Sequence, residues 1–158
     1  MRLSSPHLLQ TSVIDSNGQT RLNRQERLRL AAIGLGLALP LLVAMILTPD
    51  ARGHGTHQQL GLPPCTFVVL FGWRCPTCGM TTSWAHLVRG ELVESLRANT
   101  GGTLLGVLNL LAVAWLLLSA ARGRWTPRPL GATAGAWLAV SVTAVVLIDW
   151  AIRLAAAW

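Results

Sequence analysis

The sequence contains no lysine and no tyrosine, and charged residues of any kind make up only 12% of its 158 residues. An average soluble domain carries about 25% charged residues. Because 52% of the residues are hydrophobic and occur in long blocks, the shortage of charge does not reflect a disordered chain rich in glycine and proline. The composition therefore indicates an integral membrane protein with room for one domain.

The sequence also lacks internal repeats and any group of acidic, histidine and nucleophilic side chains that would form an acid–base set. The second absence argues against an enzyme without excluding one. All 13 basic residues are arginines, and the formal net charge is +7. In a soluble protein this charge would suggest nucleic-acid binding, but here the arginines flank apolar segments, where they interact with lipid headgroups. We expect the lipid bilayer as partner and no nucleic acid; contacts with other membrane proteins or a homo-oligomer stay open.

Three apolar segments are long enough to cross a bilayer as helices, at about residues 30–47, 103–121 and 130–148. The fold class predicted from them is an all-α integral membrane protein with three transmembrane helices. We expect residues 1–28 to be a flexible cytoplasmic tail and residues 29–158 to form a single membrane domain.

The distribution of arginines predicts the orientation. With a cytoplasmic N-terminus, eight arginines lie inside and five outside. The inner set is Arg2, Arg21, Arg24, Arg27, Arg29, Arg122, Arg124 and Arg128, and the outer set is Arg52, Arg74, Arg89, Arg97 and Arg153. Because short loops rich in arginine stay on the cytoplasmic side, we expect a cytoplasmic N-terminus and a cysteine-bearing segment that faces outward.

That segment, residues 65–99, is expected to contain two short amphipathic helices around the cysteine motif. The first places four larger apolar residues on one face, namely Met80, Trp84, Leu87 and Val88. The second carries Glu94 and Arg97 three positions apart, which favours an ion pair. Residues 48–64 are rich in glycine and proline and predict a loop. Residues 65–73 are apolar but too short to span, and fit a strand, a surface turn or a re-entrant segment.

Another pair of opposite charges, Asp149 and Arg153, lies four positions apart at the far edge of the third span. We expect these two side chains to form an exposed ion pair that anchors the helix at the membrane surface.

The motif Cys75-Pro76-Thr77-Cys78-Gly79 places two thiols three positions apart, so that they can close a disulfide ring or bind one metal ion. The simplest interpretation is a structural disulfide or tight turn. In the metal-binding interpretation the motif resembles a zinc knuckle, in which the glycine permits the turn that directs both sulfurs at one ion. Zinc would then be held by Cys65, Cys75 and Cys78, with the fourth ligand from His54, His57 or His86.

A redox interpretation has its own mechanism. If Cys75 caps a helix whose first residue is Pro76, the helix N-terminus lowers the pKa of the Cys75 thiol, and Cys78 acts as the resolving thiol. Cys65 is the only other cysteine, so the sequence offers no second pair to complete an electron relay. We expect a small membrane protein of unknown role with a structural or metal-holding motif; the alternative is a membrane thiol–disulfide oxidoreductase using Cys75 and Cys78.

The cysteine motif and its surroundings resemble a family of small bacterial membrane proteins known as domain of unknown function 2752. The family pattern is an upstream cysteine, then Cys-Pro-x-Cys-Gly-x-Thr-Arg, a Gly-Asp/Glu-Leu step and an Asn-Pro. The matching residues here are Cys65, Cys75 to Thr81, Gly90-Glu91-Leu92 and Asn99. The resemblance implies a location in a bacterial inner or cell membrane and a shared cysteine motif, and it brings no known activity.

The chain departs from the family pattern at two positions. Thr82 stands where the family usually has arginine, so any anion-binding role of that arginine is lost here. Thr100 stands where the family has proline, and we therefore expect the helix break at Gly101-Gly102.

Overall fold

The computed structural model describes residues 21–125 and 130–155. The described residues form helices and no β-strand, which confirms the all-α fold class. The elements are α1 (Arg24–Ile46), a 3₁₀ helix η1 (Thr56–Leu60), α2 (Thr66–Phe71), α3 (Met80–Leu87), α4 (Leu92–Ala98), α5 (Thr100–Arg122) and α6 (Ala132–Ala155).

Three of these helices, α1, α5 and α6, are long and apolar enough to cross a membrane, with 23, 23 and 24 residues. At about 1.5 Å per residue each is longer than the hydrocarbon core of a bilayer, which is about 30 Å thick. Large apolar side chains lie exposed along all three helices. In water such surfaces would be costly, so the helices are those of a membrane protein, as predicted.

The first helix begins earlier than the predicted span. Asn23 and Glu26 form a reciprocal capping box, in which the Asn23 side chain accepts from the Glu26 amide at 2.8 Å and the Glu26 carboxylate accepts from the Asn23 amide at 2.7 Å. Residues 24–28, which the sequence assigned to a flexible tail, are therefore helical. Residues 1–20 lie outside the described residues.

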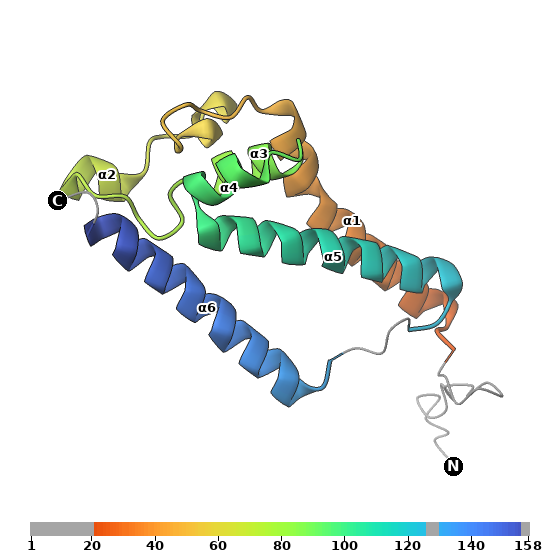
Figure 1. Ribbon diagram of the computed structural model, residues 1–158. Coiled ribbons are helices and arrows are strands. Elements are labelled where there is room, and N and C mark those ends of the chain that lie inside the picture. The colour runs from red at the N-terminus through yellow and green to blue at the C-terminus, as the bar shows by residue number, and fades with distance from the viewer. Residues whose placement is uncertain (1–20, 126–129, 156–158) are drawn as a thin grey trace, which may run out of the picture.

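The long helices form a bundle that is open on one side. α1 and α5 run roughly antiparallel and cross, with the N-terminal part of α1 against the C-terminal half of α5. α6 diverges from α5 and approaches it only near its own C-terminal end (Figure 1). A Cβ added at Gly101 would lie 2.8 Å from the Val146 side chain, so a glycine is needed where α5 meets α6. The short helices gather at the end of the bundle where α1 ends and α5 begins (Figure 1).

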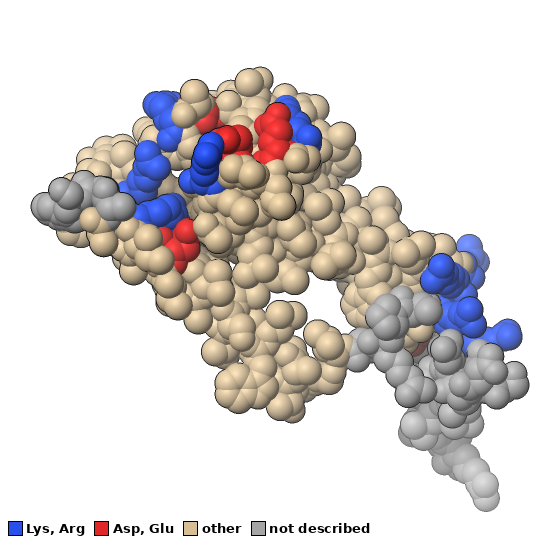
Figure 2. All heavy atoms as spheres, viewed as in Figure 1, with Lys and Arg blue, Asp and Glu red and all other residues tan. Residues whose placement is uncertain are grey.

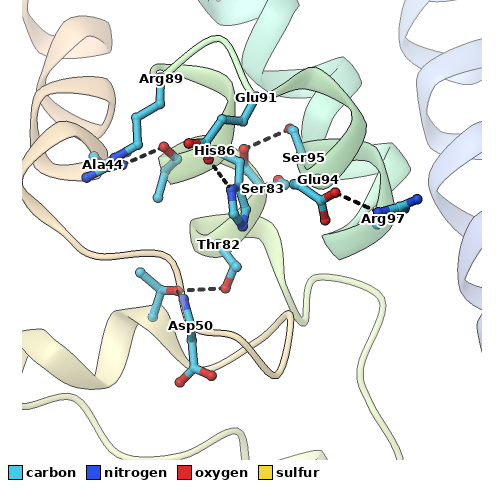
Figure 3. A network of polar contacts seen from close by, with 12 residues as sticks. Ala44, Asp50, Thr82, Ser83, His86, Arg89, Glu91, Glu94, Ser95 and Arg97 are labelled. Carbon is cyan, nitrogen blue, oxygen red and sulfur yellow. Dashed lines mark hydrogen bonds and ion pairs between the residues drawn. The ribbon is translucent and has the colours of Figure 1, made fainter.

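The core of this short-helix segment is polar. Thr82 and Ser83 of α3 are fully buried, and the Thr82 hydroxyl pairs with the Thr56 hydroxyl at 2.7 Å. The Ser95 hydroxyl, also buried, donates to the Ser83 carbonyl at 2.8 Å and pairs with the Thr103 hydroxyl at 2.7 Å. Figure 3 shows the Ser95 side chain reaching Ser83 between α4 and α3, and Thr82 pointing to the other side of α3. Small hydroxyl side chains therefore join the short helices to each other and to α5.

The predicted apolar face of α3 packs against α5 through Trp84 and Leu87. Trp84 and Leu87 lie over Gly106 of α5, where an added Cβ would be 2.6 Å from Leu87. The Trp84 indole N–H donates to the Gly102 carbonyl at 2.7 Å. α3 is thus covered on two faces, although the sequence pattern indicated only the apolar one.

Arg89 ties the short helices to α1. Its guanidinium donates to the carbonyls of Ala44, Met45 and Leu47 at 3.3, 3.1 and 2.8 Å. Figure 3 shows the Arg89 side chain extending toward Ala44. The last carbonyls of a helix have no partner within the helix, and at a membrane edge they need one from elsewhere.

The break before α5 lies at Asn99 and not at Gly101-Gly102, so that prediction was wrong. Asn99 is the N-cap, and its side chain accepts from the Gly102 amide at 2.6 Å. The glycines are inside the first turn and buried, because neighbouring helices approach them closely. Thr100 occupies the first helical position, where proline is also well accommodated, so the proline of the family pattern would fit the same helix start.

Two segments differ from the sequence prediction in detail. Residues 66–71 form the short helix α2, which was not among the alternatives considered for this stretch. The predicted loop at 48–64 contains the 3₁₀ helix η1. The predicted short helices and the Glu94–Arg97 ion pair, at 2.6 Å, are confirmed.

Gly102→Ala should lower the thermal unfolding temperature of the detergent-solubilised protein. The added Cβ would lie 2.6 Å from the Ser83 hydroxyl oxygen, and overpacking of this kind costs about 1–3 kcal/mol. Gly36→Ala is the matched control, because a Cβ there meets no atom within 4 Å. Equal melting temperatures for the two variants would contradict the close packing of α5 on α3.

Candidate metal centre

The structure brings the three cysteines of the chain together. Their sulfur atoms all lie within 4.8 Å of one another, and Cys75 Sγ donates to Cys78 Sγ at 3.3 Å. All three thiols are free. Cys65 is the residue preceding α2, and the other two lie in the turn before α3. Segments ten or more residues apart thus present their thiols to one point.

The turn that carries Cys75 and Cys78 consists of two successive tight turns. The Cys78 amide donates to the Cys75 carbonyl and the Met80 amide to the Thr77 carbonyl, both at 3.0 Å. Gly79 follows with φ of 90°, a conformation that favours glycine. A Cβ at Gly79 would also lie 2.5 Å from the carbonyl oxygen of Ala98. The glycine of the motif is therefore required for its backbone conformation and for space, as expected for a knuckle.

Two long side chains hold this turn through its carbonyls. The Asn99 amide donates to the carbonyls of Pro76 and Cys78 at 3.2 and 2.9 Å. The Arg153 guanidinium donates to the same two carbonyls at 3.2 and 3.1 Å. The cysteine turn is thus fixed by the start of α5 and by the last turn of α6. Sequence reasoning assigned neither residue to the site, although Asn99 belongs to the family pattern.

Asp149 and Arg153 were predicted to form an exposed ion pair at the membrane surface. The ion pair is present, but the prediction that it is exposed was wrong. The two side chains form an ion pair at 2.8 Å but are only 14% and 18% exposed. They are covered because Arg153 reaches the cysteine turn. Trp150 adds a further bond, donating from its indole to the Arg74 carbonyl at 2.7 Å.

The redox interpretation assumed that Cys75 caps a helix beginning at Pro76. The structure contradicts this, because the N-cap of α3 is Gly79 and the helix begins at Met80. Cys75 therefore does not occupy the helix terminus that was expected to favour its thiolate.

The Cys65 thiol has a lowered pKa. Burial raises the pKa of its thiol, but the nearby amides of Val68 and Phe67 in α2 and the other two thiols lower it, leaving the pKa at about 7. Burial and the neighbouring thiols raise the pKa of Cys78 to about 12. The cluster thus combines one readily ionised thiol with one that stays protonated while no cation is near.

The sulfurs open onto a pocket of about 440 Å³ whose lining includes two of the three predicted histidines, His54 and His57. His86 does not line it and instead pairs with Glu91 at 2.6 Å. Among the described residues, no imidazole nitrogen belongs to the sulfur cluster. His54 and His57 are therefore neighbours of the cluster, and His86 is not.

The ring orientation of both pocket histidines is set by backbone carbonyls. His54 Nδ1 bonds to the Arg52 carbonyl at 3.1 Å, and His57 Nε2 bonds to the Pro63 carbonyl at 3.2 Å. A nitrogen that donates to a carbonyl carries the proton, so in a neutral ring the other nitrogen keeps a lone pair. Metal-binding histidines commonly have this arrangement.

The sulfur positions suit a soft metal ion. In a tetrahedral site with zinc–sulfur bonds of about 2.3 Å, the sulfurs lie about 3.8 Å apart. The Cys75 and Cys78 sulfurs are 3.3 Å apart and no pair of the three is more than 4.8 Å apart, so side-chain adjustments of about 1 Å would form a three-thiolate site.

Comparison with known families identifies the same region. Residues 65–120 match the model of a family described as protein of unknown function (DUF2752), which confirms the resemblance over this stretch. The matched region contains all three cysteines, Asn99 and nearly all of α5. No curated protein and no solved structure matches the chain.

Alkylation of the reduced, metal-free protein should distinguish its thiols. At pH 7 a limiting amount of iodoacetamide should modify Cys65 before Cys78, because a thiol of pKa about 7 is half ionised and one of pKa about 12 is almost fully protonated. The rate at Cys65 should rise with pH and level off above about 8. Peptide mass spectrometry after quenching gives the order, and earlier modification of Cys78 would contradict it.

Proposed function

We propose that this small integral membrane protein holds one zinc ion through Cys65, Cys75 and Cys78. The observation that carries the proposal is the convergence of three thiols within 4.8 Å from two separate segments. Zinc is bound by thiolates in tetrahedral geometry, and binding of the cation releases their protons. The expected orientation, with the motif outside the cytoplasm, stays part of the proposal.

The fourth ligand distinguishes two kinds of zinc site. A histidine ligand would close the site and give it a structural role, whereas an open fourth position is typical of catalytic zinc. His54 and His57 border the pocket, and each keeps one ring nitrogen unengaged by its carbonyl partner. One of them would need to approach the sulfurs on metal binding.

A structural role is supported by α2, which has no buried residue. Packing alone therefore contributes little to its position. A metal bond from Cys65 to the Cys75–Cys78 turn would fix the start of α2 to the start of α3, since metal binding energy contributes directly to folding.

Thiol–disulfide exchange is the second candidate, favoured by the position of the Cys65 thiol within 4.8 Å of the Cys75 and Cys78 thiols. The Cys65 thiolate would attack a substrate disulfide, form a mixed disulfide and release one substrate thiolate. A second cysteine would then displace the other substrate thiol and form an internal disulfide. The protein would lose two electrons and two thiol protons, and the substrate disulfide would be reduced.

Metal analysis of the full-length protein, purified in detergent without chelator, tests the proposal. We expect about one zinc per chain in the wild type and a loss of most of it in each variant Cys65→Ser, Cys75→Ser and Cys78→Ser. His86→Ala is the control and should keep its zinc, because His86 lies outside the pocket. Retention or loss in His54→Ala and His57→Ala identifies the fourth ligand.

Titration of the chelator-treated wild type with cobalt(II) gives a readout that does not depend on the folding of any variant. Three thiolate ligands should produce a strong sulfur-to-cobalt charge-transfer band that zinc abolishes. No such band, together with an internal disulfide formed on addition of a small disulfide, would replace the zinc proposal with the exchange reaction.

The proposed orientation predicts that a membrane-impermeant thiol reagent, applied to intact cells after mild reduction, labels at least one of Cys65, Cys75 and Cys78. Arginine-rich segments near the spans would hold the other end of the bundle in the cytoplasm. These are the only three cysteines, so a triple serine variant is the background control. Labelling that requires permeabilised membranes would reverse the orientation.

A further inference from the structure

A second site lies at the opposite end of α1 and α5 from the cysteines. A hollow of about 470 Å³ there is lined by four arginines, by one residue before α1 and by one residue after α5. These are Arg21, Arg27, Arg122 and Arg124, then Leu22 and Gly123. Figure 2 shows basic side chains gathered at this end, separated from the charged cysteine end by an uncharged middle on the face shown.

The backbone around this hollow is ordered by long-range bonds. The Leu22 amide donates to the Gly123 carbonyl at 2.9 Å, within an isolated bridge between Arg21 and Arg124. Arg27 donates from Nε to the Ala120 carbonyl at 2.7 Å. The arginines are therefore held at the ends of two helices that are fixed to each other.

A second hollow, also of about 470 Å³, adjoins the first and shares Arg27 with it. Its lining is Arg24, Arg27, Leu28, Ala31, Leu117, Ala120 and Ala121, so it is apolar beyond its two arginines. It lies between α1 and α5 and extends from their charged ends toward the bundle. A polar basic hollow and an apolar groove thus share Arg27 as a common wall.

We propose that these two hollows together bind one anionic phospholipid, with its phosphate among Arg21, Arg27, Arg122 and Arg124 and an acyl chain in the groove between α1 and α5. Basic pockets at the ends of transmembrane helices suit the headgroups of anionic lipids. No acidic residue lines either hollow in the described part of the chain. Glu26, the acidic residue of the first turn of α1, has its carboxylate bonded to the Asn23 amide.

This site is independent of the zinc proposal, since it lies at the other end of α1 and α5. The arginine-based orientation would place it in the cytoplasmic leaflet, but binding in detergent does not depend on orientation.

Native mass spectrometry of the full-length protein in detergent, titrated with dioleoyl phosphatidylglycerol or dioleoyl phosphatidylcholine, tests the proposal. We expect one phosphatidylglycerol to bind saturably and more tightly than phosphatidylcholine. The double variant Arg21→Gln, Arg122→Gln should weaken phosphatidylglycerol binding by about tenfold or more. The control Arg52→Gln, Arg97→Gln removes the same charge at the cysteine end and should leave affinity unchanged.

A groove-filling variant and a soluble anion separate a lipid site from a simple phosphate site. Ala121→Leu should weaken phosphatidylglycerol binding, and inorganic phosphate at millimolar concentration should compete poorly. Effective competition by phosphate with no effect of Ala121→Leu would overturn the lipid assignment. Equal losses in the two arginine double variants, or equal binding of both lipids, would also overturn it.

Discussion

The cysteine turn depends on two backbone carbonyls that each accept two hydrogen bonds. Pro76 and Cys78 present them, and Asn99 and Arg153 supply the donors. Because Asn99 also caps α5, the start of that helix and the cysteine turn have one common anchor. Leaving such groups without partners in a buried setting costs about 1–3 kcal/mol each. The position of the thiols is therefore determined from outside their own loop.

The short helices are held by close contact between small residues rather than by a large apolar core. In a membrane protein the apolar side chains are satisfied by lipid, so they give the helices little reason to associate. Buried hydroxyls such as Thr82 and Ser95, and glycines such as Gly102 and Gly106, instead allow near approach and specific hydrogen bonds. This explains why the hydroxyl face of α3 is buried, contrary to the usual amphipathic pattern.

The sequence was sufficient for features that depend on local patterns. The length of the apolar segments predicted the three long helices, and the helical spacing of apolar residues predicted α3 and α4. The separation of three positions between Glu94 and Arg97 predicted their ion pair. It was insufficient where a side chain bonds to distant backbone. The carbonyls that receive Arg153 lie 75 and 77 residues earlier, and no residue pattern marks them, since every residue has a carbonyl. The helix start assigned to Cys75 was wrong because the knuckle uses those residues for two tight turns.

The position of α6 follows from the hydrogen bonds that Trp150 and Arg153 make to the cysteine-bearing segment. It has no buried residue and stands apart from α1 and α5 over most of its length (Figure 1). Its contacts with the rest of the protein are concentrated near its C-terminal end, at Val146, Trp150 and Arg153. Since two of these residues bond to the cysteine-bearing segment, displacement of α6 would remove donors from the turn. The geometry of the three thiols therefore depends on the docking of the third long helix.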